Sequence, residues 1–365
     1  MRVLFLDQFS ELGGAQRCLL DLIDGLGWDG FHAAIPAGGP LVKELKARGV
    51  VVHELPPMNY ASGRKTAADV VRFGVGTPWL AARISAIVQE QAIDALYVNG
   101  PRVLPAASLA TRRPLIYHAQ NDLGKRYASA LVKWSLRRAN ARAIACCRFV
   151  ARALPPNRLR VIYNGVRELP FAPRSRRNGR PAHVGIVGRI APEKGQLDFV
   201  HAARILSERS AGAEFHVYGA AMFSDTSYAD RVRALSCGLP ITFEGWAADI
   251  AAAFANLDLL AVPSSRIDAT PRVILEAFSA GVPVVAYASG GIPELIDDGT
   301  SGILTGSPTP EALAARIQEL LDNPAPILRI AENARTRWQE RFTIQRYARE
   351  IAAVIEEHCM SVRPR

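Results

Sequence analysis

The stretch VGIVGRIAPEKG, residues 184–195, decides the fold class of this 365-residue chain. It opens with the apolar run 184–187 that is typical of a buried strand, turns at Gly188, and leads into a helical pattern. A strand that passes through a short turn into a helix is half of a βαβ unit. The stretch therefore predicts a parallel sheet covered by helices.

The same alternation continues on both sides of that stretch. Apolar runs that predict strands lie at residues 3–7, 33–35, 50–53, 95–99, 115–118 and 142–146, then at 184–187, 214–218, 241–244, 257–262 and 282–286. Helical patterns separate several of these runs, and after Pro308 the chain reads as helical to its end. Two such series predict an α/β protein with two doubly wound, Rossmann-like domains that face a cleft.

The break between the two series is the Pro-, Gly- and Arg-rich segment LPFAPRSRRNGRPAH, residues 169–183. It has no hydrophobic period, so it is predicted to be a linker. The predicted N-terminal domain covers residues 1–168 and the predicted C-terminal domain covers residues 184–342. The last helical pattern, at about 343–360, follows no further strand series, so it has to dock on a domain that is already built.

Composition excludes several classes of protein. Hydrophobic residues make up 49% and charged residues 21%, which excludes a disordered chain and a polytopic membrane protein. Asp7 and Glu11 interrupt the place where a signal-peptide core would lie, so a cytoplasmic protein is expected. The five cysteines include no C-x-x-C pair, so neither a disulfide framework nor a zinc site is indicated.

Positive charge is concentrated in one region. Residues 102–180 contain 18 Lys and Arg but only Asp122 and Glu168, a local balance of +16 in a chain whose net charge is +10. Within this region residues 124–144 predict a basic helix with apolar side chains, which fits an anionic membrane surface. A solvated helix that packs its apolar stripe on its own domain is an equal alternative. Nucleic acid is disfavoured because exposed aromatics do not interleave with the basic residues.

Three glycine-rich turns before helices could bind an anion through backbone amides. Gly13-Gly14 follows the first predicted strand, without the G-x-G-x-x-G spacing of a dinucleotide fold. Gly290-Gly291 precedes a later helix. Between them, Arg189 and Lys194 flank the turn of residues 188–195, where two cations could clamp a diphosphate. Ordinary strand-to-helix turns and a solvent-exposed basic turn are the alternatives.

The segment DATPRVILE, residues 268–276, predicts a further anion site. Thr270 is a good N-cap and Pro271 a good first residue for a helix that ends near Gly281. Glu276 lies more than a turn inside that helix, where it could accept from a ribose diol. Asp268 could accept from sugar hydroxyls or serve only as a loop cap.

In this order and spacing, the motifs resemble those of the family 4 retaining glycosyltransferases, which have the GT-B architecture and use nucleotide-sugar donors. The resemblance covers nearly the whole chain. It is carried by GGAQR at 13–17, YNGV at 163–166, the 188–195 turn, GGIPEL at 290–295 with Asp298-Gly299 and Gly302, and the tail WQERF at 338–342.

The resemblance implies a role for each matching residue. Arg189 and Lys194 would bind the donor diphosphate, Glu276 would hold the ribose, and His118 would face the donor sugar near the anomeric carbon. Asp268 stands where the family usually has a glutamate, whose side chain is one methylene longer and reaches the donor sugar. The remaining substrate-binding positions are backbone or small residues: Gly14, Gly188, Gly219, Ala269, Thr270 and Val273.

The implied activity is retaining, metal-independent transfer of a sugar to a saccharide or lipid-linked acceptor, in cell-surface polysaccharide or lipopolysaccharide synthesis. No cofactor is expected, because the nucleotide sugar is a substrate. The resemblance also implies that the last helix packs back on the N-terminal domain, and the basic region would place the enzyme peripherally on the inner face of the cytoplasmic membrane. Two alternatives stay open: a nucleotide-sugar epimerase of the same architecture, and a non-catalytic protein that binds sugar nucleotides or membranes.

Overall fold

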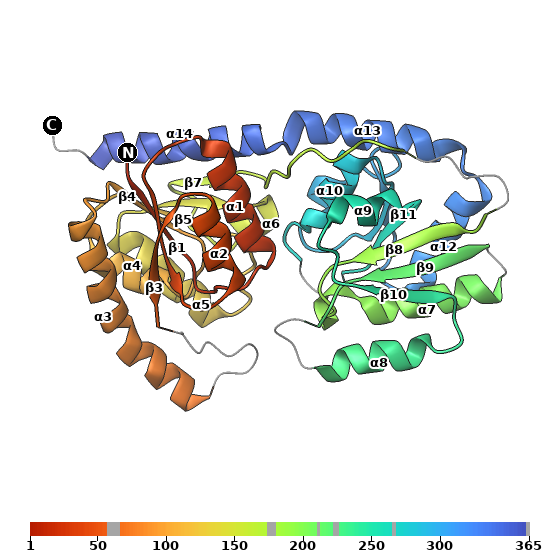
Figure 1. Ribbon diagram of the computed structural model, residues 1–365, viewed down its shortest axis with the longest axis horizontal. Coiled ribbons are helices and arrows are strands. Elements are labelled where there is room, and N and C mark those ends of the chain that lie inside the picture. Colours follow the sequence, from red (N-terminus) through yellow and green to blue (C-terminus); the bar gives the residue numbers. More distant parts are fainter. Residues whose placement is uncertain (57–65, 174–179, 210–211, 222–225, 265–267, 363–365) are drawn as a thin grey trace. The chain divides into compact units, whose positions relative to one another are not determined.

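The chain divides into two compact units, each with its own sheet (Figure 1). The computed structural model describes residues 1–56, 66–173, 180–209, 212–221, 226–264 and 268–362. Unit 1 comprises Met1–Gly165 together with Ile344–Arg365, and unit 2 comprises Val166–Thr343. Residues 174–179 of the predicted linker lie outside the described residues.

Unit 1 contains a seven-stranded parallel sheet in the order β3-β2-β1-β4-β5-β6-β7. Its strands are β1 (Val3–Leu6), β2 (Phe31–Pro36), β3 (Val51–Leu55), β4 (Ala95–Val98), β5 (Leu115–Ala119), β6 (Arg142–Ala145) and β7 (Leu159–Val161). Strand β7 was not predicted, because three residues are too few to show an apolar run.

The helices of unit 1 cover both faces of this sheet. They are α1 (Gly14–Leu26), α2 (Pro40–Ala47), α3 (Ala67–Glu90), α4 (Leu104–Ala110), α5 (Arg126–Arg138), α6 (Arg148–Ala151) and α14 (Ile344–Val362). One core joins Val3 and Phe5 of β1 to α1, α2 and α14. Tyr347, Ile351 and Ile355 of α14 are fully buried in that core, because the helix repeats an apolar residue every third or fourth position.

Unit 2 contains a six-stranded parallel sheet in the order β10-β9-β8-β11-β12-β13. Its strands are β8 (Ala182–Val187), β9 (Ala213–Tyr218), β10 (Ile241–Gly245), β11 (Leu259–Val262), β12 (Val284–Tyr287) and β13 (Ile303–Thr305). The three-residue β13 was also missed. The predicted fold class, two α/β units with doubly wound parallel sheets, is confirmed; the cleft between them stays a prediction.

Helices cover both faces of the second sheet as well. They are η1 (Pro192–Lys194), α7 (Gln196–Glu208), α8 (Thr226–Ser236), α9 (Ile250–Ala255), α10 (Arg272–Ala280), α11 (Ile292–Leu295), α12 (Pro310–Asp322) and α13 (Ala325–Arg341). Val184, Ile186, Phe215 and Val217 point into a core shared with α7, α8 and α12. Figure 1 shows α9 and α10 over the opposite face.

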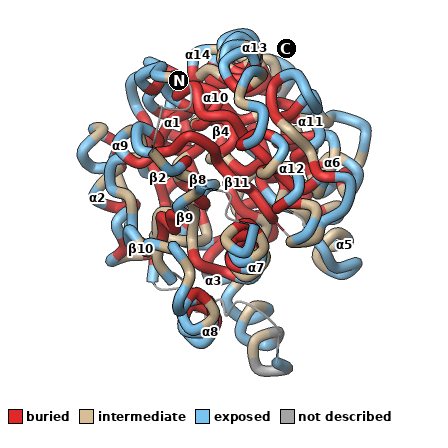
Figure 2. Tube along the Cα trace, turned by 90° about the vertical axis from the view of Figure 1, so that its right-hand side faces the viewer, coloured by how far each residue is buried: buried red, intermediate tan, exposed pale blue. Residues whose placement is uncertain are grey.

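Burial follows the expected layering. Figure 2 shows the central strands buried, and α8 with both buried and exposed residues. Helix α5 ends at Arg138, not at residue 144 as predicted, because Asn140 adopts a positive φ of 50° and the chain then enters β6. Over the described residues, no helix combines the length and apolar character needed to cross a bilayer.

Candidate functional site

Two neighbouring strands of unit 2 send their following loops in opposite directions. Strand β8 pairs with β9 on one side and with β11 on the other, so the strand order reverses between β8 and β11. In open α/β sheets ligands bind at such a switch point, beyond the carboxyl ends of the strands. The loop after β8 carries Gly188, Arg189 and Lys194, and the loop after β11 leads to Asp268.

A salt bridge joins these two loops. Lys194 Nζ lies 2.6 Å from Asp268 Oδ2, and their side chains are 26% and 16% exposed. Ser264 Oγ donates to the same carboxylate oxygen over 3.3 Å. Partial burial shields the pair from bulk water, so its charges interact more strongly there than on an open surface. The loop after β8 is therefore held against the loop after β11 at the switch point.

Glycines allow the backbone segments of this region to approach one another closely. A Cβ atom on Gly195 would lie 1.8 Å from the carbonyl oxygen of Pro263, and one on Gly290 would lie 2.1 Å from that of Asp268. A Cβ on Gly219, which follows β9, would lie 1.9 Å from the carbonyl oxygen of Gly188. Any side chain at these positions would push the loops apart.

Polar contacts fix the turn that carries the two cations. Arg189 donates to Glu193 Oε1 over 2.8 Å, and its side chain is 30% exposed. Gln196 Nε2 donates to the carbonyl oxygen of Arg189 over 2.7 Å, and Gln196 Oε1 accepts from the Ala191 amide over 3.2 Å. The fully buried Gln196 thus ties the start of α7 back to the 188–195 turn.

Helix α10 begins beside Asp268, as the sequence predicted, but with a different cap. Pro271 is the N-cap and Arg272 the first helical residue, so Thr270 is not the N-cap. Pro271 has a φ of −58° and a ψ of 111°, and this ψ lies outside the helical region, so the helix begins one residue later than predicted. Thr270 is buried.

The predicted ribose-binding carboxylate lies one turn into α10. Glu276 Oε1 accepts from Arg272 over 3.1 Å, and the two side chains are 15% and 11% exposed. Ala269 is buried and Val273 is half-buried. The structure therefore places Gly188, Arg189, Lys194, Gly219 and Asp268 at one edge of the second sheet, with Ala269, Thr270, Val273 and Glu276 continuing from it.

A second switch point lies in unit 1, between β1 and β4. Asp7 follows β1 and accepts from Asn99, which follows β4, over 2.7 Å, and from Gln16 of α1 over 2.9 Å. Asp7 is fully buried, and burial raises the pKa of its carboxyl to about 6. These bonds hold the first turn of α1, where Gly14 is exposed, against the end of the sheet.

His118 lies inside unit 1 at the end of β5. Its ring is 1% exposed, Nδ1 lies 2.5 Å from the Tyr97 hydroxyl, and Gln120 contacts both ring nitrogens. The ring also packs on Tyr347 of α14. Burial lowers the pKa of His118 to about 3, so the imidazole is neutral at physiological pH. His118 and Gly14 belong to unit 1, whereas the other predicted site residues belong to unit 2.

Sequence reasoning missed several residues of these two regions. Ser264, Gln196 and Asp7 contact predicted site residues or hold their loops, yet none was selected. Two of them were detectable in part: Asp7 directly follows β1 and Ser264 lies two residues after β11, where the carboxyl ends of the strands of each parallel sheet gather. Gln196 gave no signal, because one glutamine at the start of a helix is usually a surface residue.

Two family models match the chain, one in each unit. "Glycosyltransferase Family 4" matches residues 12–168, and "Glycosyl transferases group 1" matches residues 181–323. Together they cover most of both sheets.

Curated relatives match over part of their length. The D-inositol 3-phosphate glycosyltransferase of Corynebacterium kroppenstedtii is 30% identical over 221 residues, which is 55% of this chain and 49% of that protein. The GDP-mannose-dependent alpha-(1-6)-phosphatidylinositol monomannoside mannosyltransferase of Mycobacterium tuberculosis is 32% identical over 155 residues, 40% of each protein. The chain spans about half or less of the length of these relatives.

A solved structure matches the chain almost completely. Anabaena Alr3699/HepE in complex with UDP-glucose superimposes with a TM-score of 0.83 at 26% identity, covering 98% of this chain and 100% of that one. The similarity extends through both units and the last helix.

Proposed function

Because this chain belongs to the family 4, group 1 glycosyltransferases, we propose that it transfers a sugar from a nucleotide-diphosphate sugar to a saccharide or lipid-linked acceptor with retention of configuration. The observation that carries the proposal is the Lys194–Asp268 pair, which spans the switch point of the second sheet beside Arg189 and the start of α10. Cations and helix amides gathered at a switch point are suited to a diphosphate.

The reaction demands negative charge stabilisation at the leaving group. When the bond between the anomeric carbon and the diphosphate breaks, positive charge develops on the sugar and negative charge on the departing phosphate. Fixed cations that face this phosphate lower the barrier by stabilising the transition state. Lys194 and Arg189 supply that charge, so the transfer step needs no metal ion at this site.

We propose that neighbouring residues bind the ribose and the sugar of the donor. Glu276 has one carboxylate oxygen bonded to Arg272, and its other oxygen would accept from the ribose hydroxyls. Asp268 orients Lys194 and would contact the sugar from the same carboxylate. His118 would face the donor sugar near the anomeric carbon as a neutral hydrogen-bonding group, since its low pKa keeps it uncharged.

A uridine nucleotide is the donor that we propose to test first. HepE, which matches the whole chain, has been solved with UDP-glucose, whereas the mycobacterial relative is named for GDP-mannose. The relative named for a phosphatidylinositol mannoside supports a lipid-linked acceptor. We further propose that the transfer belongs to cell-surface polysaccharide or lipopolysaccharide synthesis.

Unit 1 has a surface suited to such an acceptor. Val71, Val75 and Trp79 are exposed at successive turns of α3, and Tyr127 and Trp134 are exposed on α5. The basic side chains of Lys125, Arg126, Arg137 and Arg138 lie on or beside α5 and are exposed too. The expectation that no exposed aromatics lie among the basic residues is therefore wrong for α5, because Tyr127 and Trp134 are exposed there. Such a surface suits an anionic membrane, so we propose peripheral attachment through α5.

The direct test replaces charges at the proposed donor site. We expect Lys194→Ala to lower kcat/KM about 10- to 100-fold, the loss of one charge-assisted hydrogen bond, and Glu276→Ala to raise the KM for the donor. Arg329→Ala removes an exposed cation from α13 of the same unit and serves as the control. Sugar transfer from UDP-, GDP- and ADP-sugars is measured, and unchanged turnover in both site variants would contradict the assignment.

The same assay separates the alternative functions. A nucleotide-sugar epimerase would convert labelled donor to its epimer in the absence of any acceptor. A non-catalytic protein would bind the donor, with a rise in melting temperature, and release no product over an acceptor panel. Product that forms only when an acceptor is present supports the transferase.

A further inference from the structure

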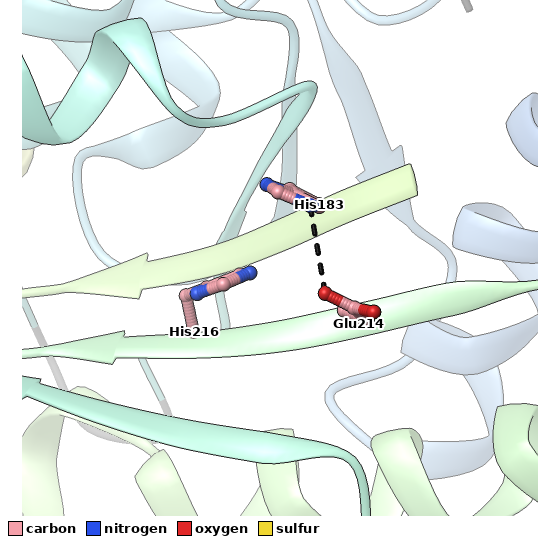
Figure 3. Close-up of side chains that lie close together, drawn as sticks. All are labelled: His183, Glu214 and His216. Atoms are coloured by element: carbon pink, nitrogen blue, oxygen red, sulfur yellow. Dashed lines mark ion pairs between the residues drawn. The ribbon is translucent and has the colours of Figure 1, made fainter. Parts of the chain in front are cut away.

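Three side chains with metal-binding atoms lie together on unit 2, away from the carboxyl ends of its strands. His183 of β8 and Glu214 of β9 are direct partners in the parallel register, and His216 follows Glu214 by two residues. Side chains at i and i+2 of a strand point to the same face, so all three share the face opposite the Val184–Phe215 core. Figure 3 shows Glu214 and His216 on β9 beside His183 on β8.

Both histidines are held with their Nε2 atoms toward this group. His183 Nδ1 lies 3.0 Å from the carbonyl oxygen of Asn256, and His216 Nδ1 lies 2.9 Å from Glu244 Oε1. A carbonyl and a carboxylate can only accept, so each Nδ1 carries the proton and each Nε2 of a neutral ring presents a lone pair. Metal-binding histidines are oriented in this way, by a hydrogen bond from the second nitrogen to an oxygen.

Among the described residues, no arrangement of protons satisfies both Nε2 atoms and the Glu214 carboxylate at once. His183 Nε2 faces Glu214 Oε2 at 3.5 Å, which places one acceptor against another. His216 is 9% exposed, and its Nε2 atom is buried without a hydrogen-bond partner among the described residues. Protonation of His183 Nε2 would let it donate to Glu214, but His216 Nε2 would still have no hydrogen-bond partner among the described residues.

The geometry points to a divalent transition-metal site, with Zn²⁺ as the best-suited ion, formed by His183 Nε2, His216 Nε2 and one oxygen of Glu214. The ligand atoms all lie within 4.8 Å of one another. In a tetrahedral zinc site with bonds of about 2.0–2.1 Å, ligand atoms lie about 3.4 Å apart, so small side-chain rotations complete it. Glu214 is 49% exposed, which leaves the fourth position open to water.

Such an ion would crosslink β8 and β9 near their amino ends. The proposed donor site lies beyond the carboxyl ends of the same strands, so metal binding and sugar transfer are separate properties. The inference therefore does not depend on the proposed function.

The test uses the full chain, treated with a chelator and then titrated with Zn²⁺ in calorimetry. We expect one Zn²⁺ per chain, a higher melting temperature with Zn²⁺, and the visible absorption bands of tetrahedral Co²⁺ when Co²⁺ replaces it. Glu214→Gln and His183→Gln, both at partly exposed positions, should each lower the affinity at least about tenfold. Glu244→Gln, which only orients His216, should lower it about 10- to 100-fold while preserving the stoichiometry.

Two controls address other histidines. His201→Gln removes an exposed histidine from α7 of the same unit and should leave Zn²⁺ binding unchanged. His53→Gln removes one member of the His32–His53 pair of unit 1, whose nitrogens lie 3.2 Å apart, and should also leave it unchanged. If the double variant His183→Gln/Glu214→Gln folds and binds Zn²⁺ as the parent does, or if the parent binds none, the inference is wrong.

Discussion

Individual residues at the proposed donor site act mainly by holding loops at fixed distances. Lys194 and Asp268 are 74 positions apart in sequence, yet their charged atoms lie 2.6 Å apart. Gly195 follows Lys194 and has no side chain, so its backbone can lie against the Pro263 carbonyl and bring the two loops together. The charge pair and the adjacent glycine therefore have to be considered together.

Alanine substitutions at two glycines distinguish the effect of the close Gly195–Pro263 approach from the cost of a positive φ alone. Gly195 has a φ of +74°, and Gly238 has a φ of +78° with nothing within 4 Å of the position that a Cβ atom would take. Gly238→Ala should lower the free energy of unfolding by about 1–2 kcal/mol, the cost of a left-handed alanine. Gly195→Ala should cost more and also weaken donor binding, because the added methyl displaces the Pro263 carbonyl.

Urea unfolding followed by circular dichroism gives the two free energies, and calorimetry with UDP gives the affinity. Equal losses of stability in both variants, with normal UDP binding, would show that the Gly195–Pro263 approach is unimportant.

The buried carboxyl of Asp7 makes stability depend on pH. Its pKa is about 6 in the folded chain against 3.8 in the unfolded one. Between these values the folded state binds the extra proton, so the contribution of Asp7 to stability decreases as pH rises from about 4 to above 6. Asp7→Asn should remove this contribution, worth about 2–3 kcal/mol over that range.

The measurement compares urea unfolding of the parent and Asp7→Asn from about pH 4 to about pH 7, which spans the range between the two pKa values. As pH rises, the parent should lose stability relative to Asp7→Asn, because only the parent has the carboxyl whose pKa is raised in the folded state. A difference that is constant over the range would contradict a raised pKa.

At the scale of elements, the helices of unit 1 differ in how they use their apolar residues. Helix α14 buries Tyr347, Ile351 and Ile355, whereas α5 buries Val132 and Leu136 and leaves other apolar side chains exposed. Residues 124–144 were expected to bind a membrane or to pack their apolar stripe on the domain. The structure shows part of each arrangement: Leu136 packs on the domain, whereas Tyr127 and Trp134 are exposed on the surface.

The exposed part of α5 can be tested with vesicles. Trp134→Ala and Arg137→Gln should each reduce sedimentation with anionic phosphatidylglycerol vesicles at low salt, since one removes an aromatic anchor and the other about 1 kcal/mol of electrostatic attraction. Binding by the parent should weaken as salt rises and should be small on neutral vesicles. Arg329→Gln, on unit 2, is the control for lost charge.

If the parent binds neutral and anionic vesicles equally, or binds neither, α5 does not attach the protein to membranes. Loss of binding in Arg329→Gln as well would show a general charge effect.

At the scale of the whole molecule, each unit has its own sheet and its own core. The proposed donor contacts from Arg189, Lys194, Asp268 and Glu276 all lie in unit 2. A ligand that binds these contacts stabilises the native state of the unit that holds them.

Hydrogen exchange in the presence of UDP tests this arrangement. We expect slower exchange in segments 188–197 and 268–277 of unit 2, because bound ligand restrains their backbone. Lys194→Ala should reduce this protection at the same UDP concentration. Protection confined to unit 1, with unit 2 unchanged, would place the nucleotide elsewhere.

The sequence by itself determined the alternation of strands and helices, since apolar runs and the helical period of 3.6 residues are local properties of the chain. It also identified the loops that carry Arg189, Lys194 and Asp268, because short turns after apolar strands are recognisable from a few residues. Strands β7 and β13 were not predicted, because three residues are too few to form a recognisable apolar run.

Only the tertiary structure decided which of these residues meet. The Lys194–Asp268 pair depends on β8 and β11 being neighbours, and the His183–Glu214–His216 group depends on the register of β8 and β9. Strand order and register arise from packing between residues far apart in sequence, so no local pattern contains them. The lack of a C-x-x-C motif indicated no zinc site in the sequence, but a local motif of this kind cannot reveal the proposed histidine site, whose residues lie on neighbouring strands.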